Sequence, residues 1–564
     1  MDEKQKIVDL LYPIVGEHLN KDEIMGLIEV PANQEFGDLA FPTFQLAKTY
    51  RQAPQKIAEE ITEKLGNPEG FSEITAIGPY INFKSNREFV TKHVISNVLE
   101  QGSDYGKTDI GKQGNITIDM SSPNIAKPMS MGHLRSTVIG NALSFILEKL
   151  NYNVIRINHL GDWGTQFGKL IVAYRKWGDE ETVRKDPVNE LVKLYVEFHE
   201  RAEEDPALDE EGRAAFKALE DGDEDVVALW NWFKDESIKA FQKVYDLLNV
   251  HFDYYTGESF YNDKMQPIID ELEDKGISEV EQGAVIVRLD EEDLPPALIQ
   301  KSDGATLYLT RDLATAYYRK ATFDFVESLY IVGNEQTNHF NQLKAVLKRL
   351  GRDWADDMHH IPFGLITLNG KKLSTRKGKI VLLEDVLNEA TKLAYEQIET
   401  KNPDLPNKDE VAAQVGPGAV IFHDLKNERL HNFDFNLQEV VQFEGETGPY
   451  VQYAHARIQT ILEKYGKEVE ANVNNVVTDD YSWQIVKLLE QYPKVVIRAA
   501  KQYEPSVVSK YLISLAQAFN KYYGNTRILE DDEQLEARIA LISAVAIVLK
   551  DGLSLLGIAA PNKM

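Results

Sequence analysis

The chain has 564 residues, no cysteine and a formal net charge of −28, from 62 Lys and Arg against 90 Asp and Glu. Its length favours three or four domains, and the lack of cysteine excludes a disulfide framework or a thiolate metal site. The acidic balance argues against indiscriminate nucleic-acid binding, but local basic and aromatic patches can still hold an RNA. No apolar run approaches the roughly 18 residues of a membrane span, and the first residues lack the apolar core of a signal peptide. We therefore expect a cytoplasmic protein that binds no membrane.

Residues 1–105 are predicted to form an N-terminal α+β domain. Apolar residues recur at helical spacing in three segments, which are 7–19, 40–51 and 54–65. An alternating strand is expected over 77–84, and residues 101–108 resemble a linker. Tyr80 and Asn82 lie on that strand, where an aromatic and an amide are ordinarily structural.

A strand, a loop and a helix follow one another between Asn115 and Leu150. Residues 115–120 alternate as a strand does, and from His133 the apolar residues have helical spacing. The loop between them delivers Ser130 to a helix N-terminus, where free N–H groups favour anions such as phosphates. Gly132 would let a flat base approach the backbone, and His133 could donate to a ribose or phosphate oxygen. A Gly-His pair that opens a helix is also a common structural cap, so the local pattern leaves both interpretations open.

A second strand over 152–160 completes a βαβ unit and predicts a parallel sheet with right-handed crossovers. Ligands bind at the carboxyl ends of such strands. His159 and Gln166 follow this end and are candidate contacts, unless the stretch is only a glycine-rich turn with Trp163 packed in the core. Residues 178–260 are acidic and helical in pattern, which indicates a solvated insertion without chemistry of its own.

A candidate cation pocket comes from residues 303–319, which are predicted to pass from a strand into a helix at about Thr310. Tyr308 and Asp312 are four residues apart and would share one helix face. A carboxylate with a phenol beside it can bind a cation through charge and hydrogen bonds. Asp119, Tyr308 and Asp312 could supply that set, although Asp312 alone could be a carboxylate favoured by the helix dipole.

Two further stretches carry candidate ligands. Residues 328–333 form a short buried-type strand, after which Gln336 could face a ligand. A basic loop over 370–379 could close on a triphosphate and stabilise charge as pyrophosphate leaves. A basic loop alone is a weak signal.

The chain is predicted to be mostly helical after Glu384, with a break at Gly416–Gly418. Tyr450 and Tyr453 are three residues apart and therefore close to one helix face, where they could stack on splayed RNA bases. Both could equally be core tyrosines.

The longer string Ser-Pro-Asn-Ile-Ala-Lys-Pro followed by Met-Gly-His-Leu-Arg-Ser-Thr (residues 122–137) resembles the signature of class I aminoacyl-tRNA synthetases, and specifically of the arginyl-tRNA synthetase family. Residues 159–168 match a further family stretch, and Lys-Leu-Ser-Thr-Arg-Lys (372–377) is similar to the class I Lys-Met-Ser-Lys-Ser loop. Residues 444–458 and 561–564 are also similar to the family's C-terminal domain. The resemblance covers nearly the whole chain, from about Gly37 to Met564.

This resemblance implies an α/β fold with a class I Rossmann-type nucleotide-binding catalytic domain over 110–383. That domain would carry the helical insertion at about 178–260 and the signature loop at 370–379. An N-terminal α+β additional domain (1–105) would meet the outer corner of a tRNA. A helical connector (384–440) and an all-α anticodon-binding domain (441–564) would complete the chain.

The resemblance also implies the reaction. L-arginine would be activated with ATP to arginyl-adenylate and transferred to the 3′-terminal adenosine of tRNA(Arg), releasing pyrophosphate and AMP. Mg²⁺ would travel with the nucleotide without a metal site of the protein's own, activation would need bound tRNA, and a monomer is expected.

Residue by residue, the resemblance implies four sets of contacts. The catalytic set is His133, Lys127, Lys372 and Arg376. The ATP-binding set is Ser130, Met131, Gly132, His133, Lys372 and Ser374. The arginine-binding set is Asp119, Asn124, Tyr308, Asp312, Gln336 and His159. The tRNA-binding set is Tyr80, Asn82, Tyr450, Tyr453, Tyr522 and Met564.

Two positions depart from the family pattern. Ser130 stands where the family usually has the first histidine of His-x-Gly-His, and Thr375 stands where its loop has a second lysine. We expect Lys127 or Arg376 to replace the missing charge. The departures leave two other hypotheses open, which are a related ligase that adenylates arginine or another cation for an acceptor other than tRNA, and a non-catalytic RNA-binding paralogue.

Overall fold

The computed structural model describes residues 2–368, 370–373, 380–471 and 473–564. The chain divides into two compact units. Unit 1 comprises Met1–Gly106, Ala454–Val495 and Ile513–Asp551, and unit 2 comprises Lys107–Tyr453, Val496–Leu512 and Gly552–Met564. Parts of the C-terminal helices group with the N-terminal region in unit 1, and the boundaries of the four expected domains stay a prediction.

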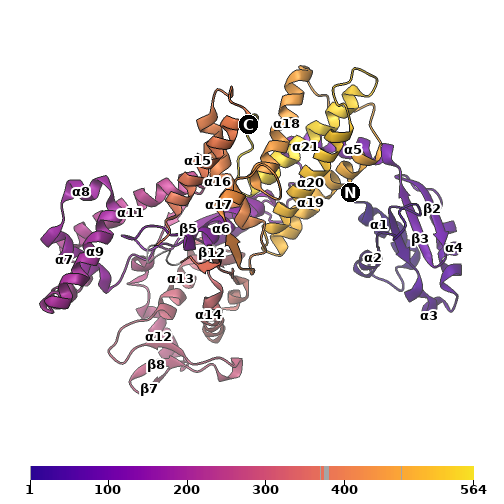
Figure 1. The fold of residues 1–564 in the computed structure, drawn as a ribbon. Coiled ribbons are helices and arrows are strands. Elements are labelled where there is room, and N and C mark those ends of the chain that lie inside the picture. Colours follow the sequence, from indigo (N-terminus) through magenta and orange to yellow (C-terminus); the bar gives the residue numbers. More distant parts are fainter. Residues whose placement is uncertain (1, 369, 374–379, 472) are drawn as a thin grey trace. The chain divides into compact units, whose positions relative to one another are not determined.

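The N-terminal part of unit 1 is a small antiparallel sheet with helices, drawn in indigo in Figure 1. Its strands have the order β1-β3-β2 and are β1 (Leu39–Pro42), β3 (Tyr80–Ser85) and β2 (Phe71–Ile77). Its helices are α1 (Glu3–Val15), α2 (Lys21–Leu27), α3 (Ala47–Tyr50), α4 (Pro54–Leu65) and α5 (Arg87–Gln101).

Two predictions for this part are wrong. Segment 40–51 begins as strand β1 and not as a helix, because the run pairs with β3 and Phe41 is buried in the core. The expected single strand over 77–84 is a hairpin, in which Ile77 pairs with Tyr80 across a turn at Gly78 and Pro79. Gly78 has a φ of +57°, a conformation that suits glycine.

Each of the four C-terminal helices belongs partly to unit 1 and partly to unit 2: unit 1 takes the C-terminal parts of the first and third and the N-terminal parts of the second and fourth. They are α18 (Gly448–Tyr465), α19 (Asp480–Lys501), α20 (Ser506–Asn525) and α21 (Leu535–Leu555). Within unit 1 the hydroxyl of Tyr105 donates to the carbonyl of Leu489 at 2.6 Å, and Arg87 pairs with Asp480 at 2.9 Å. These contacts attach α5 and the turn after it to α19.

Unit 2 is built on a parallel sheet of five strands. Their order is β11-β10-β4-β5-β6, with β11 (Met358–Ile361), β10 (Glu327–Ile331), β4 (Asn115–Asp119), β5 (Asn153–Asn158) and β6 (Tyr254–Tyr255), and every pairing is parallel. Helix α6 (Leu134–Lys149) connects β4 to β5, which confirms the predicted βαβ unit. The strand order reverses between β4 and β10, so the crevice at their carboxyl ends is where an open α/β sheet binds ligands.

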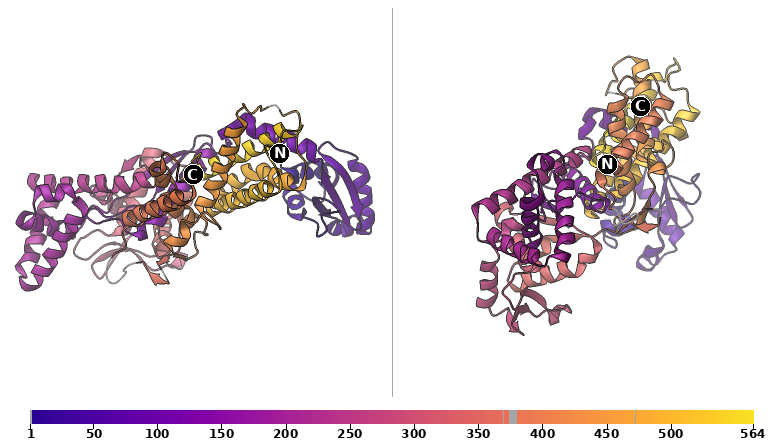
Figure 2. Two further views of the ribbon diagram at one scale, coloured as in Figure 1. Left: turned by 45° about the horizontal axis from the view of Figure 1, so that its top comes forward. Right: turned by 60° about the vertical axis from the view of Figure 1, so that its left-hand side comes forward.

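A helical insertion leaves the sheet after β5. Its helices are α7 (Thr165–Trp177), α8 (Glu180–Lys185), α9 (Pro187–Glu204), α10 (Ala207–Glu220) and α11 (Glu224–Leu247). They pack mainly on one another, and both views in Figure 2 show them as one group of neighbouring helices.

The chain then forms a small antiparallel sheet and returns to the parallel sheet. This part contains α12 (Gln266–Asp274), β7 (Glu279–Glu281), β8 (Ala284–Val287), β9 (Ala297–Gln300), α13 (Tyr308–Phe323) and α14 (Thr337–Arg349). The expected strand within 303–309 is absent, and the helix begins at Tyr308 and not at Thr310, so Tyr308 and Asp312 lie one turn apart at its start.

The remaining elements of unit 2 are β12 (Ile366–Leu368), β13 (Lys371–Lys372), β14 (Phe433–Phe435), α15 (Leu383–Lys401), α16 (Lys408–Leu425) and α17 (Leu437–Val440). The predicted helix break at Gly416–Gly418 is wrong, since α16 continues through it. A Cβ on Gly416 would lie 2.5 Å from the backbone of Thr391, so the glycine serves the close packing of α16 on α15.

Short 3-10 helices complete the fold. They are η1 (Phe44–Leu46), η2 (Gly102–Asp104), η3 (Met131–His133), η4 (Glu258–Tyr261), η5 (Asp290–Glu292), η6 (Asn334–Gln336) and η7 (Asp353–Asp357). Among the described residues, no helix is both long enough and apolar enough to cross a membrane.

Candidate active site

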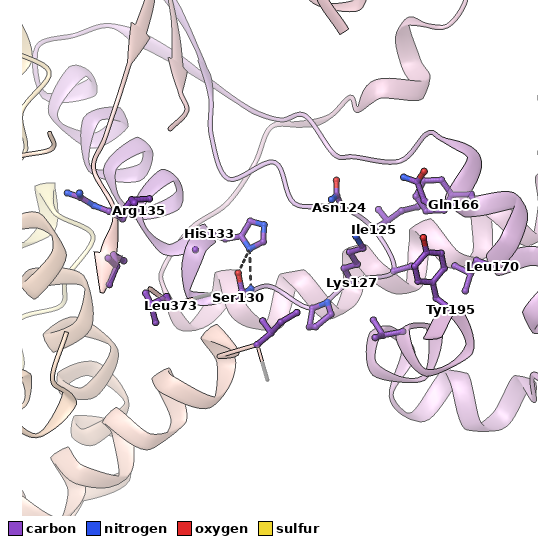
Figure 3. Close-up of a pocket in the computed structure, with 18 of the residues that line it drawn as sticks. Asn124, Ile125, Lys127, Ser130, His133, Arg135, Gln166, Leu170, Tyr195 and Leu373 are labelled. Carbon is purple, nitrogen blue, oxygen red and sulfur yellow. Dashed lines mark hydrogen bonds between the residues drawn. The ribbon is translucent and has the colours of Figure 1, made fainter. Parts of the chain in front are cut away.

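A cavity of about 640 Å³ lies beside the loop that joins β4 to α6 (Figure 3). The loop lines it with Asn124, Ile125, Ala126, Lys127, Pro128, Ser130, Gly132 and His133, and α6 adds Arg135. The insertion contributes Gln166, Phe167, Leu170, Val192 and Tyr195, and the opposite wall is formed by Phe363, Gly364, Leu365, Ile366, Leu373 and Ile380. The structure therefore brings five of the predicted site residues of this loop to one cavity at the carboxyl end of β4.

His133 is held in a defined orientation at the start of α6. The backbone N–H of Ser130 donates to Nδ1 of His133 at 3.1 Å, and the Ser130 hydroxyl lies 3.3 Å from the same nitrogen. Burial lowers the pKa of His133, so the ring is neutral at pH 7. Because Nδ1 accepts, the ring proton resides on Nε2, which makes that nitrogen a hydrogen-bond donor.

The backbone around Gly132 is open to the cavity. Gly132 is exposed, and a Cβ built on it would meet only the Ser130 hydroxyl, at 3.3 Å. Met131 is buried, and its N–H donates to the carbonyl of Val381 at 3.0 Å. Met131 can thus contribute backbone to the site, but its side chain belongs to the core.

Asn124 and Lys127 are both exposed along the same loop. The loop is fixed at Asn124 by close approach to Gly161, whose N–H donates to the carbonyl of Pro123 at 3.0 Å. A Cβ at position 161 would lie 1.9 Å from Oδ1 of Asn124. The glycine at this position therefore leaves room for the Asn124 side chain.

A second group of predicted residues lies on helix α13 and the ends of neighbouring strands, outside the lining of this cavity. Tyr308 is 72% exposed at the first turn of α13, and Asp312 accepts a hydrogen bond from Nε2 of His339 at 2.5 Å. Gln336 is exposed at the end of β10. These groups sit at the same switch point as the cavity.

Asp119, at the end of β4, already has internal partners. Its Oδ2 accepts from Nη2 of Arg319 at 2.9 Å, and its Oδ1 accepts from the hydroxyl of Ser122 at 3.0 Å. Arg319 lies on α13 and is fully buried. Burial lowers the pKa of His159, against the nearby carboxylates of Asp119 and Asp312, which act to raise it.

Sequence reasoning missed three charged groups near Asp312. Arg319 follows Asp312 by seven residues, and this helical spacing was a signal that could have revealed it. Glu258 in η4 and Arg311 lie beside Asp312 without any local motif. Burial raises the pKa of Glu258 to about 7, opposed by Arg311, and the carboxylates of Asp162 and Asp312 raise it further.

The predicted RNA contacts in unit 1 lie around a smaller cavity of about 260 Å³. Tyr80 and Asn82 line it together with Phe36 and Ile77, which are both exposed. The side chain of Asn82 is largely buried, at 3% exposure. The amide of Asn33 and the carboxylate of Glu29 also line this cavity, so it combines apolar and aromatic side chains with hydrogen-bonding groups.

The predicted C-terminal contacts differ in accessibility. Tyr450 and Tyr453 are half-buried on α18, and the ammonium of Lys401 lies 5.6 Å from the Tyr453 ring centroid. Met564 is mostly buried, and its carbonyl accepts from the side chain of Asn402 at 3.1 Å. The prediction that Tyr522 contacts tRNA is wrong, because this residue is 0% exposed and its ring is unavailable for stacking on a base.

The predictions for the signature loop fall largely outside the described residues. Ser374, Thr375 and Arg376 are not described, and the side chain of Lys372 is not described either. At the base of the hairpin that leads to this loop, the N–H of Gly370 donates to Asp434 at 2.8 Å. Among the described residues, no three His, Asp or Glu side chains are arranged to hold a metal ion.

Three family models match consecutive parts of the chain. The arginyl tRNA synthetase N terminal domain matches residues 4–85, the catalytic domain of tRNA synthetases class I (R) matches 94–437, and the DALR anticodon binding domain matches 451–564. The catalytic match spans the cavity and both groups of residues described above.

Curated relatives and solved structures agree over the full length. The arginine--tRNA ligases of Enterococcus faecalis and Latilactobacillus sakei are 61% and 58% identical, and each match covers 100% of both chains. The Thermus thermophilus arginyl-tRNA synthetase structure has a TM-score of 0.80 at 26% identity and covers 100% of both chains. The Plasmodium falciparum structure has a TM-score of 0.80 at 25% identity, covering 100% of this chain and 99% of that one. The chain belongs to the arginyl-tRNA synthetase family of class I aminoacyl-tRNA synthetases.

Proposed function

We propose that this protein joins L-arginine to tRNA(Arg) in two steps. In the first, a carboxylate oxygen of arginine attacks the α-phosphorus of ATP, which forms arginyl-adenylate and releases pyrophosphate. In the second, a ribose hydroxyl of the terminal adenosine of the tRNA attacks the carbonyl carbon, AMP leaves, and the hydroxyl proton is released. The observation that carries this proposal is the cavity at the switch point of the sheet, which is lined by residues of the loop from Asn124 to His133.

His133 and Lys127 are the groups that would stabilise phosphate charge in the first step. The Nε2–H of His133 is a neutral donor whose orientation is fixed from behind by Ser130. A pre-oriented donor costs no reorganisation when charge develops in the transition state. Lys127, exposed on the same loop, would supply the positive charge that Thr375 does not provide. Further contacts to ATP would come from the signature loop at 370–379, through Lys372, Ser374 and Arg376.

The adenine base would lie against Gly132. The open backbone there and the wall from Phe363 to Ile366 border the same cavity. Catalysis in this arrangement rests on positioning and electrostatic stabilisation, and no covalent protein nucleophile is needed.

Selection of arginine would come from α13. Tyr308 and Asp312 stand one turn apart and present a phenol and a carboxylate, while Asn124 and Gln336 would hold the substrate's amino group. Asp119 is engaged by Arg319, so its contribution would be to fix the electrostatics of the pocket while a remaining lone pair accepts from the substrate. His159 would add a neutral contact behind the substrate.

Contacts with tRNA would come from both units. The pocket at Tyr80 and Asn82 would receive an unstacked base, and Tyr450, Tyr453 and the chain end at Met564 would form a second contact. Base stacking on an aromatic ring contributes roughly 1 to 3 kcal/mol. Lys401 beside Tyr453 adds positive charge for the phosphate backbone.

Three further properties belong to the proposal. Mg²⁺ would arrive as part of the ATP complex, which suits a cation that keeps most of its water and binds substrate phosphates. The protein would act in the cytoplasm and as a monomer. Light scattering of the purified chain tests the oligomeric state, because a monomer gives the mass of one chain.

The experiment that tests the proposed function is a charging assay with labelled arginine, purified tRNA(Arg) and MgATP, with lysine and citrulline as competing substrates. We expect charging with arginine alone. Charging of no tRNA, with arginine still adenylated, would favour a ligase with another acceptor. Binding of tRNA without any ATP turnover would favour the non-catalytic paralogue. Lys127→Ala should slow adenylate formation, and an unchanged rate would exclude Lys127 as the replacement charge.

A further inference from the structure

We propose that Arg135 is a positioning residue for ATP, because it holds the wall of the cavity formed by residues 363–366 in place from behind. This inference rests on the proposed function for the identity of the nucleotide. Arg135 follows His133 by two residues on the first turn of α6, yet its side chain points away from the phosphate end of the site. It is 1% exposed, so its guanidinium acts through other groups.

The guanidinium of Arg135 joins two segments that are far apart in the sequence. One of its terminal nitrogens, Nη1, donates to the carbonyl of Gly364 at 3.1 Å and to the carbonyl of His431 at 3.0 Å. Its Nε faces the carboxylate of Asp424 at 3.4 Å. The charge is thereby compensated inside the protein, and the position of the Gly364 carbonyl is tied to α6.

Two aromatic rings lie close to this guanidinium. Its central carbon lies 4.8 Å from the ring centroid of Phe433 and 6.0 Å from that of Phe363. Phe363 and Gly364 both line the cavity. A lysine keeps the charge but loses the planar fork and the stacking, so the two residues are not interchangeable here.

Gly364, in the wall of the cavity, packs tightly against the segment that contains Arg429 and His431. The N–H of Gly364 donates to the carbonyl of Arg429 at 2.8 Å, and a Cβ on Gly364 would lie 2.8 Å from the carbonyl oxygen of His431. Arg429 in turn donates to the carbonyl of Pro362 at 2.7 Å. Two arginines therefore hold both ends of the turn from Pro362 to Gly364, and a change at Arg135 must move the cavity surface.

The wall lies at the end of the cavity that holds the nucleotide. In Figure 3, Arg135 and Leu373 lie on the side of Ser130 and His133, whereas Asn124 and Gln166 lie toward the other side. Loss of the planar guanidinium of Arg135 should therefore weaken ATP binding much more than arginine binding. A residue with only a structural role would lower stability without this selectivity.

The test compares Arg135→Lys with wild type by calorimetric titration of ATP into the full-length protein, and by the KM values of ATP and arginine in pyrophosphate exchange with tRNA(Arg) present. We expect at least a tenfold weaker ATP affinity, a parallel rise in the KM for ATP, and a KM for arginine within twofold of wild type. The matched control is Arg538→Lys, because Arg538 is also buried and also donates to two carbonyls, those of Ile528 and Glu530, but lies in unit 1. This control should leave ATP affinity unchanged.

Should Arg135→Lys fail to fold, Phe433→Leu removes one stacking ring while keeping the guanidinium, and we expect a severalfold loss of ATP affinity. Unchanged ATP affinity in the folded variants, or equal losses for ATP and arginine, would overturn the inference. ATP binding is measured without arginine or tRNA. A wild-type protein that binds ATP but never charges tRNA would therefore refute the proposed function and still allow this inference to be judged.

Discussion

Asp119 and Arg319 form a buried ion pair, with Oδ2 and Nη2 separated by 2.9 Å, between the end of β4 and helix α13. The pair joins β4, which leads into the loop from Asn124 to His133, to the helix that carries Tyr308 and Asp312. An internal guanidinium thus stands beside the place proposed for the guanidinium of the substrate. The proposed arginine pocket would therefore have the positive charge of Arg319 at its base, which the carboxylates around it must balance.

Breaking this pair should be costly for stability. Arg319→Met leaves the Asp119 carboxylate buried without its partner, and we expect the free energy of unfolding to fall by about 3 to 5 kcal/mol. Asp119→Asn combined with Arg319→Met should recover much of this loss, because two neutral groups need no compensation. Thermal denaturation of the single and double variants measures the coupling. Additive losses in the double variant would show that the two residues do not act as a pair.

His133→Ala should lower the rate of arginine-dependent pyrophosphate exchange by roughly 100- to 1,000-fold, as expected for loss of one oriented donor. Ser130→Ala is the matched control, since the Ser130 N–H still orients the ring, and should cost less than tenfold. Because burial lowers the pKa of His133, protonation of this ring should reduce the rate only at a pH below 6.5. A rate that follows a protonation near pH 7 and loses that step in His133→Ala would contradict the neutral-donor role.

Gly161→Ala should affect arginine and not ATP. The added methyl group would occupy the position of Oδ1 of Asn124, at 1.9 Å, so the Asn124 side chain must rotate away. We expect the KM for arginine to rise about tenfold, which corresponds to about 1.4 kcal/mol. Gly132→Ala adds a methyl group to the other end of the cavity and should raise the KM for ATP instead. Kinetics with each substrate varied in turn would separate the two effects, and the same change in both variants would be inconsistent with the assignment.

Glu258 should make stability depend on pH. Its pKa is raised to about 7 mainly by burial, so between about pH 4.5 and 7 the folded protein holds a proton that the unfolded chain has lost. This contribution is fully present below pH 4.5 and disappears as the pH rises through 7. Glu258→Gln should therefore raise the melting temperature relative to wild type more at pH 8 than at pH 5, by the equivalent of roughly 1 to 3 kcal/mol. An equal difference at both pH values would show that Glu258 titrates normally.

The parts of the site that could be predicted from the sequence are those encoded locally. The loop from Asn124 to His133 carries its own turn residues and helix start, and the structure brings these residues to one cavity. Arg319 could not be found in the same way from Asp119, because 200 residues separate the partners and only the fold joins them. No sequence motif marks Phe363 and Gly364 as part of the cavity wall, because their position is set by Arg135 and Arg429 on two other segments.

Errors in the fold also have local causes. Apolar residues over 40–51 have helical spacing, but pairing with β3 outweighs that preference and produces strand β1. Gly416 and Gly418 favour a helix break in the sequence, but glycine inside a helix also permits close packing of a neighbouring helix. Tyr522 has the composition of a stacking residue, and only the packing of α20 places it in the core.

The central claim is that this cavity activates arginine. The most direct measurement is arginine-dependent exchange of pyrophosphate into ATP, with and without tRNA(Arg), using the full-length protein and lysine and citrulline as controls. Exchange with arginine alone among the amino acids, and only with tRNA present, is the predicted result and would also establish the dependence on tRNA. No exchange with arginine under either condition would contradict the account and mean that Ser130 and Thr375 mark a lost active site.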